Sequence, residues 1–530
     1  MKPWLTAIAM MMLAASPAGA RGMEDATIET LSADMAAGRI SSEKAVRAYL
    51  KRIAVMDRRG PRLNSIIAIN PRAIAEARAL DAERRAGRLR GPLHGVPILL
   101  KDNIEAAGMP TTAGSLALAR NDQNRDSPVA ASLRAKGAVI LGKTNLSEWA
   151  NFRSERSLSG WSAVGGLTRN PYALDRTTCG SSSGSGAAVA AGFAPAAIGS
   201  ETNGSIICPS SMTGLVGLKP TIGLIPRTHI VPISHSQDTA GPMAHRVRDV
   251  ALLLSALIAS DPADPTTADA MAHAKDYAAA LNPAKIATMR IGVLRGGAQP
   301  ELLARYEAAL AVLKGLGATL VEVKKPPMEG MSAASYEVLQ YEFKADLNAY
   351  LASTRSDQVG ARTLEALIAF DAAHADEEMP LFGQDIFIAS QAKGGLDDPA
   401  YRTAREKSLR LAGRQGIDAM LQDYRVDMLV TISYGPAWPS DTVWGDQYEG
   451  PGGATGPAAI AGYPHLTVPM GLVRGLPVGL SFIGSAYGEQ ALLDAGLAYE
   501  QAAKIAIKPD FRPTVDAGPE LEGGGAALKQ

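Results

Sequence analysis

The sequence predicts an α/β fold, and two observations carry this prediction. Hydrophobic residues make up 46% of the 530-residue chain and charged residues 20%, so a sizeable packed core is expected instead of disorder. Segments with helical periodicity alternate with short apolar strands between residues 26 and 145. Such an alternation predicts helices that cover a sheet. Length alone allows two to four average domains as well as one large domain.

The first 145 residues contain the clearest elements. Apolar residues at helical spacing predict two helices between Ala26 and Met56, and Ser41 or Ser42 can cap the second. The strand ending in PILLK stops its apolar run at Lys101. In chain order, the elements that follow the two helices are a strand at 64–70, a helix at 71–87 with proline in its first turn and glycine after its end, the buried strand within 95–101, a helix at 129–136 and a strand at 138–142.

Later elements are sparser. A small-residue helix at 187–191 follows the stretch GSSSGSG (180–186), and a short strand and a loop lie within 196–209. Residues from about 290 to 430 are helix-rich. The remaining predicted elements are strands at 289–295, 318–323, 465–473 and 476–484 and a closing helix at 489–503. The chain has no internal repeat and no long linker, so GSSSGSG does not join two obvious domains.

Residues 1–20 have the order of a Sec-type signal peptide. Lys2 precedes an apolar stretch from Trp4 to about Ala15, and a small-residue cleavage site ends at Ala20. The stretch is too short to span a bilayer, and no later run of about 18 apolar residues appears. We therefore expect a mature protein that starts near Arg21, is exported to the periplasm or secreted, and is not embedded in a membrane.

Charge and metal-binding patterns exclude other classes of function. Lysine plus arginine and aspartate plus glutamate number 53 each, so no net field attracts nucleic acid or acidic membranes. The seven histidines never occur as HxxxH or HExxH, so we expect no zinc site. The two cysteines, Cys179 and Cys208, are able to form a disulfide in an exported protein, but we favour two buried free thiols.

The GSSSGSG stretch admits three readings from its residues alone. A linker needs independent domains on either side, and a phosphate cradle needs a lysine after the last glycine; neither condition is met. Gly180 to Gly184 also match the nucleophile elbow G-x-S-x-G with Ser182 as nucleophile. An elbow follows a strand directly, whereas DRTTC (175–179) is loop-like.

Together with other stretches, this loop resembles the amidase signature family. The match extends in order from about residue 30 to 505, and GSSSGSG with SETNGSIICP and PISHSQDTAGPM most resembles the bacterial peptide amidase branch. The stretches that carry the resemblance are GVPILLKDN (95–103), GMPTTAGS (108–115), LGKTNLSEWA (141–150), TRNPY (168–172), GSSSGSGAAVAAG (180–192), GSETNGSIICPSSMTGLVGLKPTIG (199–223), DTAGPM (238–243) and GLPVGLSFIG (475–484).

The resemblance implies a Ser-cisSer-Lys triad. The family's lysine falls on Lys101, its cis-serine on Ser181 and its nucleophile on Ser205. The interval of 24 positions from Ser181 to Ser205 agrees with the family's spacing and argues against Ser182 or Ser183 as the bridging serine.

The resemblance also implies the groups around the reacting carbonyl. Backbone N–H groups of Thr202, Asn203, Gly204 and Ser205 are expected to form the oxyanion hole. Ser182 is a further candidate on the substrate side, although we expect its hydroxyl chiefly to support Ser181. Cys179, Ser183 and Asn203 stand where many members have glycine, and Asn203 is the departure that bears on substrate range.

The chemistry requires a lysine that is neutral at working pH. An amide resists attack, and a serine hydroxyl becomes a strong nucleophile only when a base removes its proton. An unperturbed lysine has a pKa of about 10.4, so burial must lower it by several units. The apolar residues before Lys101 favour such burial. Asp102 and Asn103 are expected to support the site, and Asp238 is expected to be a turn residue.

The resemblance further implies one large α/β/α domain with a mixed central sheet over residues 21–510, followed by a loose tail at 511–530. It implies hydrolysis of C-terminal carboxamides of peptides to the acid and ammonia, without a metal or organic cofactor. The substrate is then a peptide or small-molecule amide, and the oligomeric state is left open. The alternatives are a broad aryl or aliphatic acylamidase or an esterase of the same family, and an exported peptide-binding protein with a dead active site. We expect residues 290–450 to shape the pocket.

Overall fold

A computed structural model describes residues 22–448 and 455–516 of the chain. Within those residues the central sheet is mixed and has eleven strands in the order β1-β3-β2-β6-β8-β7-β12-β13-β11-β9-β10. β2 runs parallel to both β3 and β6, and β9 runs parallel to β10 and β11. The strands of this sheet are β1 (Ile66–Ile69), β2 (Pro97–Lys101), β3 (Val139–Thr144), β6 (Ala196–Glu201), β7 (Val216–Lys219), β8 (Thr239–Ala244), β9 (Arg290–Leu294), β10 (Thr319–Val323), β11 (Met428–Ile432), β12 (His465–Val473) and β13 (Leu476–Ile483); β4 (Trp161–Ser162) and β5 (Gly166–Leu167) pair separately.

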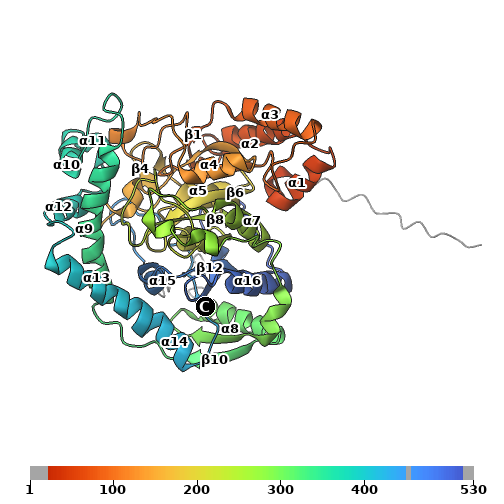
Figure 1. The fold of residues 1–530 in the computed structure, drawn as a ribbon. Coiled ribbons are helices and arrows are strands. Elements are labelled where there is room, and N and C mark those ends of the chain that lie inside the picture. Colours follow the sequence, from red (N-terminus) through yellow and green to blue (C-terminus); the bar gives the residue numbers. More distant parts are fainter. Residues whose placement is uncertain (1–21, 449–454, 517–530) are drawn as a thin grey trace, which may run out of the picture.

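Helices flank this sheet and confirm the α/β prediction. α5 contacts β2, β3 and β6, whereas α7 and α16 pack on β7, β8 and β12. The band from α9 to α14 runs along one side of the molecule, at the left and bottom of Figure 1. The helices are α1 (Ile28–Ala36), α2 (Ser42–Met56), α3 (Ala73–Arg85), α4 (Pro128–Ala135), α5 (Ser183–Ala190), α6 (Ile207–Met212), α7 (Val247–Leu257), α8 (Pro300–Gly315), α9 (Met331–Ala352), α10 (Leu364–Ala373), α11 (Ala375–Glu378), α12 (Asp385–Gln391), α13 (Pro399–Ala412), α14 (Asp418–Asp423), α15 (Thr455–Ala461) and α16 (Glu489–Ala503).

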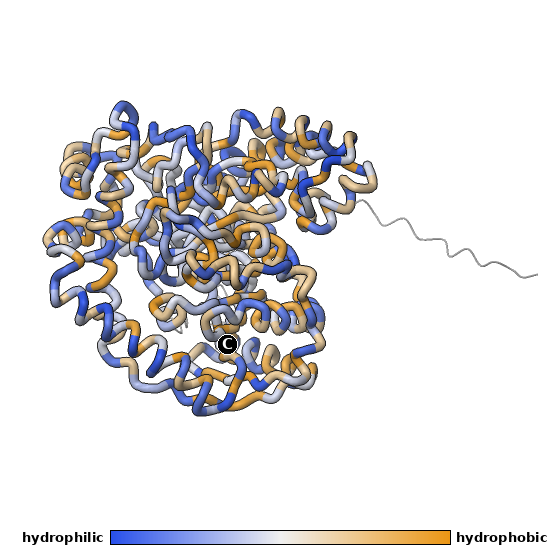
Figure 2. The backbone as a smooth tube through the Cα atoms, in the orientation of Figure 1, coloured by the Kyte–Doolittle hydropathy of each residue, from blue (hydrophilic) through white to orange (hydrophobic). Residues whose placement is uncertain are grey.

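Hydropathy explains why these elements pack as they do. The outer helices alternate hydrophilic and hydrophobic positions along their length (Figure 2). In α2, for example, Val46, Tyr49 and Ile53 are buried on one face, and the Ser41 side chain caps the N-terminus by accepting from Lys44 N–H. All residues of β2 and β3 are buried, as expected for parallel strands covered on both sides.

The structure differs from the predicted elements around the two serine loops. α5 begins at Ser183, four residues earlier than expected, because the small residues of GSSSGSG continue directly into the helix. α6 was not predicted, since its six residues are too few to show a helical period and include Pro209. Both differences place a helix N-terminal turn next to an expected catalytic serine.

Two further predicted segments flank the domain, a signal peptide and a loose tail. The predicted signal peptide at 1–20 lies outside the described residues. The first part of the predicted loose tail is attached to the domain instead: Phe511 N–H donates to Pro171 O at 3.0 Å, and Leu174 N–H donates to Arg512 O at 2.9 Å. In the part of the chain that the structure describes, no helix is long and apolar enough to cross a membrane.

Candidate active site

Lys101 lies at the carboxyl end of β2, in the interior of the sheet. Its side chain is fully buried, between the neighbouring parallel strands β3 and β6. Burial lowers the pKa of Lys101 to about 7, and the charges of Asp238 and Glu201 oppose this shift. The sequence-based expectation that the PILL run would bury this amine is confirmed.

Three polar atoms surround the Lys101 amine. Nζ lies 2.7 Å from Ser181 Oγ, 2.9 Å from Ser200 Oγ and 3.2 Å from the Ser200 carbonyl oxygen. Asn103 Nδ2 donates to Ser200 Oγ at 2.8 Å and so holds this hydroxyl in place. A neutral amine has two N–H donors and one lone pair, so the two Ser200 oxygens can accept while the lone pair faces Ser181.

Ser181 follows a cis peptide bond between Gly180 and Ser181, as the family resemblance implied. The segment then enters α5, and Ser182 at its N-cap is fully buried, as is Ser183. The Ser182 hydroxyl donates to Ser200 O at 3.1 Å and accepts from Ser200 N–H at 3.3 Å. Ser182 therefore ties the Ser181 segment to β6, which fits a supporting role and not contact with a substrate.

Ser205 lies in the turn between β6 and α6 and is buried, with 8% exposure. The Glu201 carboxylate shapes this turn, because Oε2 accepts from the N–H groups of Ile206 at 2.8 Å and Ile207 at 3.1 Å. Gly204 has φ +82°, in the left-handed region that favours glycine, and a Cβ there would lie 2.6 Å from Tyr434 Oη. The turn thus requires glycine beside the expected nucleophile.

The backbone of this turn offers unpaired donors. Within the described residues, the N–H groups of Asn203, Gly204 and Ser205 donate to no other protein group. Unpaired N–H groups converging near a nucleophile are the arrangement that stabilises an oxyanion. Asn203 itself is exposed, so its side chain is accessible to a substrate.

The two serine segments meet but their hydroxyls do not bond. Ser182 N–H donates to Ser205 O at 3.2 Å, yet within the described residues no hydrogen bond joins Ser181 Oγ to Ser205 Oγ. Catalytic hydrogen bonds are often long without substrate and tighten in the reactive complex. The structure therefore brings Lys101, Ser181 and Ser200 into contact and places Ser205 beside them.

A disulfide joins Cys179 to Cys208, so the expectation of two free thiols was wrong. Their Cα atoms are 5.9 Å apart, within the range that a disulfide spans. The sequence could not reveal this distance, because it depends on how α5 and α6 pack together. The bridge links the segment of Ser181 to the helix that follows Ser205.

Asp238 belongs to the site, beyond the turn role expected from the sequence. Its carboxylate accepts from Thr202 Oγ1 at 2.5 Å and from the N–H groups of Ile233 and Ser234 at 2.8 and 2.9 Å. Burial raises the pKa of Asp238 to about 6, against the lowering effect of these hydrogen bonds. Asp238 thereby anchors Thr202 at the start of the expected oxyanion turn.

Other neighbours hold β2 in place. Asp102 pairs with Lys143 at 2.7 Å, and both side chains are fully buried. This ion pair connects the end of β2 to β3, so Asp102 supports the strand that carries Lys101, as expected.

A cavity of about 690 Å³ reaches the site, a size suited to a small-molecule or short-peptide ligand. Ser200, Thr202 and Asp238 lie in its wall. The 230–233 segment contributes apolar residues to its lining, and α9 contributes Tyr350 and nearby residues. The expectation that the helix-rich region shapes a pocket is confirmed for this helix.

His235 and Asp346 line the same cavity and form a cluster with the buried Glu342. His235 Nδ1 is 2.9 Å from Asp346 Oδ2 and Nε2 is 3.4 Å from Glu342 Oε1. The hydrogen bond to Asp346 raises the pKa of His235. Because both ring nitrogens face carboxylates, we interpret the cluster as an ion pair that fastens the 233–238 segment to α9, and not as a metal site.

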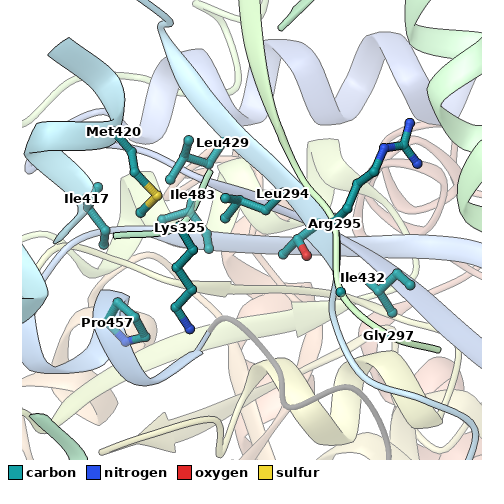
Figure 3. Close-up of a pocket in the computed structure, with 12 residues that line it drawn as sticks. Leu294, Arg295, Gly297, Lys325, Ile417, Met420, Leu429, Ile432, Pro457 and Ile483 are labelled. Carbon is teal, nitrogen blue, oxygen red and sulfur yellow. The ribbon is translucent and has the colours of Figure 1, made fainter. Parts of the chain in front are cut away.

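A second cavity, of about 370 Å³, lies at the carboxyl ends of β9 and β11 (Figure 3). Its lining mixes apolar side chains, among them Met420, Leu429 and Ile483, with polar ones, and the Lys325 side chain reaches toward Pro457. None of the predicted site residues lines this cavity.

Comparison with known proteins identifies the family of this chain. A family model described as Amidase matches residues 44–493. A probable amidase of Arabidopsis thaliana is 35% identical over 501 residues, covering 92% of each chain. A subunit of the glutamyl-tRNA(Gln) amidotransferase of Halorhodospira halophila is 37% identical over 494 residues. The alignment covers 90% of this chain and 97% of that subunit.

Solved structures give a stronger match. The native peptide amidase of Stenotrophomonas maltophilia superposes with a TM-score of 0.87 at 48% identity, covering 92% of this chain and 99% of its own. A peptide amidase bound to the competitive inhibitor chymostatin has a TM-score of 0.88 at 49% identity, with the same coverage. The chain therefore belongs to the amidase signature family, and it is a hydrolase that acts on amides.

Proposed function

We propose that this enzyme hydrolyses the C-terminal carboxamide of peptides to the free acid and ammonia. The observation that carries the proposal is the likeness to the peptide amidase of Stenotrophomonas maltophilia over 92% of the chain. The large cavity beside Ser200 and Thr202 supports a substrate of peptide size. The proposed catalytic residues are Lys101, Ser181 and Ser205.

Lys101 acts as the base in this proposal. With a pKa of about 7, a substantial fraction of its amine is neutral at neutral pH. The lone pair accepts the Ser181 proton across the 2.7 Å contact, while Ser181 Oγ accepts the proton of Ser205. Ser205 Oγ then forms a bond to the carbonyl carbon of the amide.

The negative charge that develops on the carbonyl oxygen is held by the N–H groups of the 202–205 turn. Each well-placed donor of this kind contributes about 3 kcal/mol to the stabilisation of the transition state. As the C–N bond breaks, the proton returns through Ser181 to the leaving nitrogen, and ammonia departs. Water then attacks the carbonyl carbon of the Ser205 ester and gives its proton to the same relay. The bond from this carbon to Ser205 Oγ breaks, the relay returns the proton to Ser205 Oγ, and the acid leaves.

Ser200 is a positioning residue that sequence reasoning did not single out. Substitution Ser200→Ala removes one acceptor from Lys101 and the partner of Asn103 while keeping the backbone carbonyl contact. We expect kcat to fall about tenfold and KM to change little, because the Ser200 hydroxyl bonds Lys101 and Asn103 and so acts through the base. Steady-state kinetics with circular dichroism checks this; an unchanged kcat would exclude a role for the hydroxyl in orienting the lysine.

The substrate class is tested by ammonia release from the purified protein. C-terminally amidated di- and tripeptides are compared with anilides, aliphatic amides, esters and free glutamine. Release from peptide amides with intact internal peptide bonds supports the proposal. Activity confined to anilides, aliphatic amides or esters would assign a broad acylamidase or esterase, and activity confined to glutamine would favour a role like that of the amidotransferase relatives.

We also propose that the enzyme is exported after cleavage behind Ala20. The charged start, apolar stretch and small-residue site of residues 1–20 support this, as does a disulfide, which persists mainly in oxidising compartments. N-terminal sequencing of the protein from a periplasmic or culture fraction should begin at Arg21. An intact Met1 in the cytoplasmic fraction alone would refute export.

A further inference from the structure

The disulfide lies where the two proposed catalytic serines approach each other. Cys179 is two residues before Ser181, and Cys208 is three residues after Ser205. Cys208 N–H also donates to Gly204 O at 2.8 Å, so the bridge is attached directly to the oxyanion turn. A movement of either cysteine therefore moves a reacting segment.

Within the described residues, one backbone hydrogen bond joins residues 179–183 directly to residues 202–208. The direct backbone bond between them runs from Ser182 N–H to Ser205 O and is 3.2 Å long. The two hydroxyls are not bonded to each other within the described residues. Apart from Val189, the residues of α5 are glycine, alanine and serine, so this helix offers few side chains that could interlock with α6.

The backbone of Cys179 indicates that its side chain has a function. Its φ is +59°, in the left-handed region that residues other than glycine, asparagine and aspartate rarely adopt. Its neighbours hold this conformation: Thr177 Oγ1 accepts from Cys179 N–H at 2.9 Å, and Ser183 Oγ donates to Cys179 O at 2.6 Å. A glycine would fit this backbone more easily but would remove the cross-link.

We propose that the Cys179–Cys208 disulfide is a positioning element of the active site, which sets the separation of Ser181 and Ser205, and that full turnover requires its oxidised form. The inference rests on the roles proposed above for these two serines. Formation of this disulfide transfers two electrons and two protons from the thiols of Cys179 and Cys208 to the disulfide of an oxidant, which is released as a dithiol. A dithiol reductant reverses the exchange.

The test compares the wild-type enzyme with the double variant Cys179→Gly, Cys208→Ala. Glycine adopts φ +59° readily, so this variant removes the cross-link without adding backbone strain. We expect kcat to fall at least about tenfold while KM changes by less than about threefold, because small displacements of reacting groups act on the chemical step. Any amide that the wild-type enzyme hydrolyses serves as substrate, whatever its natural one.

A matched control separates positioning from stability. Leu31→Ala empties a buried site in α1, outside the catalytic machinery, and should lower the melting temperature while leaving kcat unchanged. If the double variant does not fold, wild-type enzyme reduced with dithiothreitol, with its thiols counted by DTNB, gives the same comparison. Slow reduction is expected, since Cys179 is 7% and Cys208 1% exposed.

The outcomes are distinct. A folded enzyme without the disulfide that keeps the wild-type kcat would overturn this inference, even if its melting temperature falls. If Ser205→Ala is still active, the proposed triad itself is wrong. If Ser205→Ala is inactive and the double variant is folded but slow, the result supports both the proposed triad and the positioning role of the disulfide.

Discussion

Substitution Ser205→Ala is expected to lower kcat by about 10⁴-fold or more, because removing the nucleophile of a covalent mechanism leaves only binding and oxyanion stabilisation. Binding of a peptide amide should persist, since the turn and the cavity keep their shape. Single-turnover kinetics with mass spectrometry of the enzyme checks both points. Wild-type enzyme should carry an acyl group on Ser205 during turnover, and the variant should carry none.

Ser210→Ala is the matched control for this experiment. Ser210 lies in α6, shortly after Ser205, and its buried hydroxyl has no hydrogen-bond partner within the described residues. We expect its removal to change kcat by no more than about twofold, since no polar contact is lost. Wild-type rates in Ser205→Ala would move the nucleophile to another residue.

Substitution Lys101→Met is expected to lower kcat by about 10³-fold or more, because Ser181 then has no base to accept its proton. Methionine keeps much of the apolar stem and adds no charge to a fully buried position. For the wild-type enzyme, kcat/KM should rise about tenfold per pH unit up to about pH 7 and level off above it. The sign follows from the chemistry: protonated Lys101 has no lone pair, and its pKa is about 7.

Lys219→Met provides the control for burial of a lysine. Lys219 is also fully buried, its pKa is lowered to about 8 by burial, and its Nζ donates to Pro220 O at 2.9 Å. The Lys219→Met variant should still show the rise of kcat/KM up to about pH 7. The Lys101→Met variant should lose this pH dependence. A wild-type rate that does not vary between pH 5 and 8 would contradict a lysine base.

The sequence determined the elements whose signal is local. The apolar run of β2 and its end at Lys101, the paired helices before Met56 and the strands β12 and β13 all show a clear period or turn pattern. Such elements can be predicted because neighbouring residues alone produce them. The candidate triad of Lys101, Ser181 and Ser205 came instead from the resemblance to the amidase signature family, which rests on motifs in the family's order along the chain.

The remaining parts of the site depend on contacts between distant segments. Ser200 is an ordinary strand serine until β6 pairs with β2 and brings its hydroxyl within 2.9 Å of Lys101 Nζ. Asp238 meets Thr202 because β8 runs antiparallel to β6, which places Thr239 opposite Glu201. Strand order is decided by long-range hydrogen bonding and burial, which no local pattern encodes.

The disulfide likewise depends on both the sequence and the tertiary structure. The sequence supplied two cysteines beside two serine loops, and either free thiols or a bridge was chemically possible. Only the packing of α5 against α6 brings the Cα atoms to 5.9 Å. The residues able to do the chemistry were therefore determined by the sequence, and their separation, burial and protonation were decided by the tertiary structure, because distance and solvent exclusion arise only when the sheet and its helices assemble.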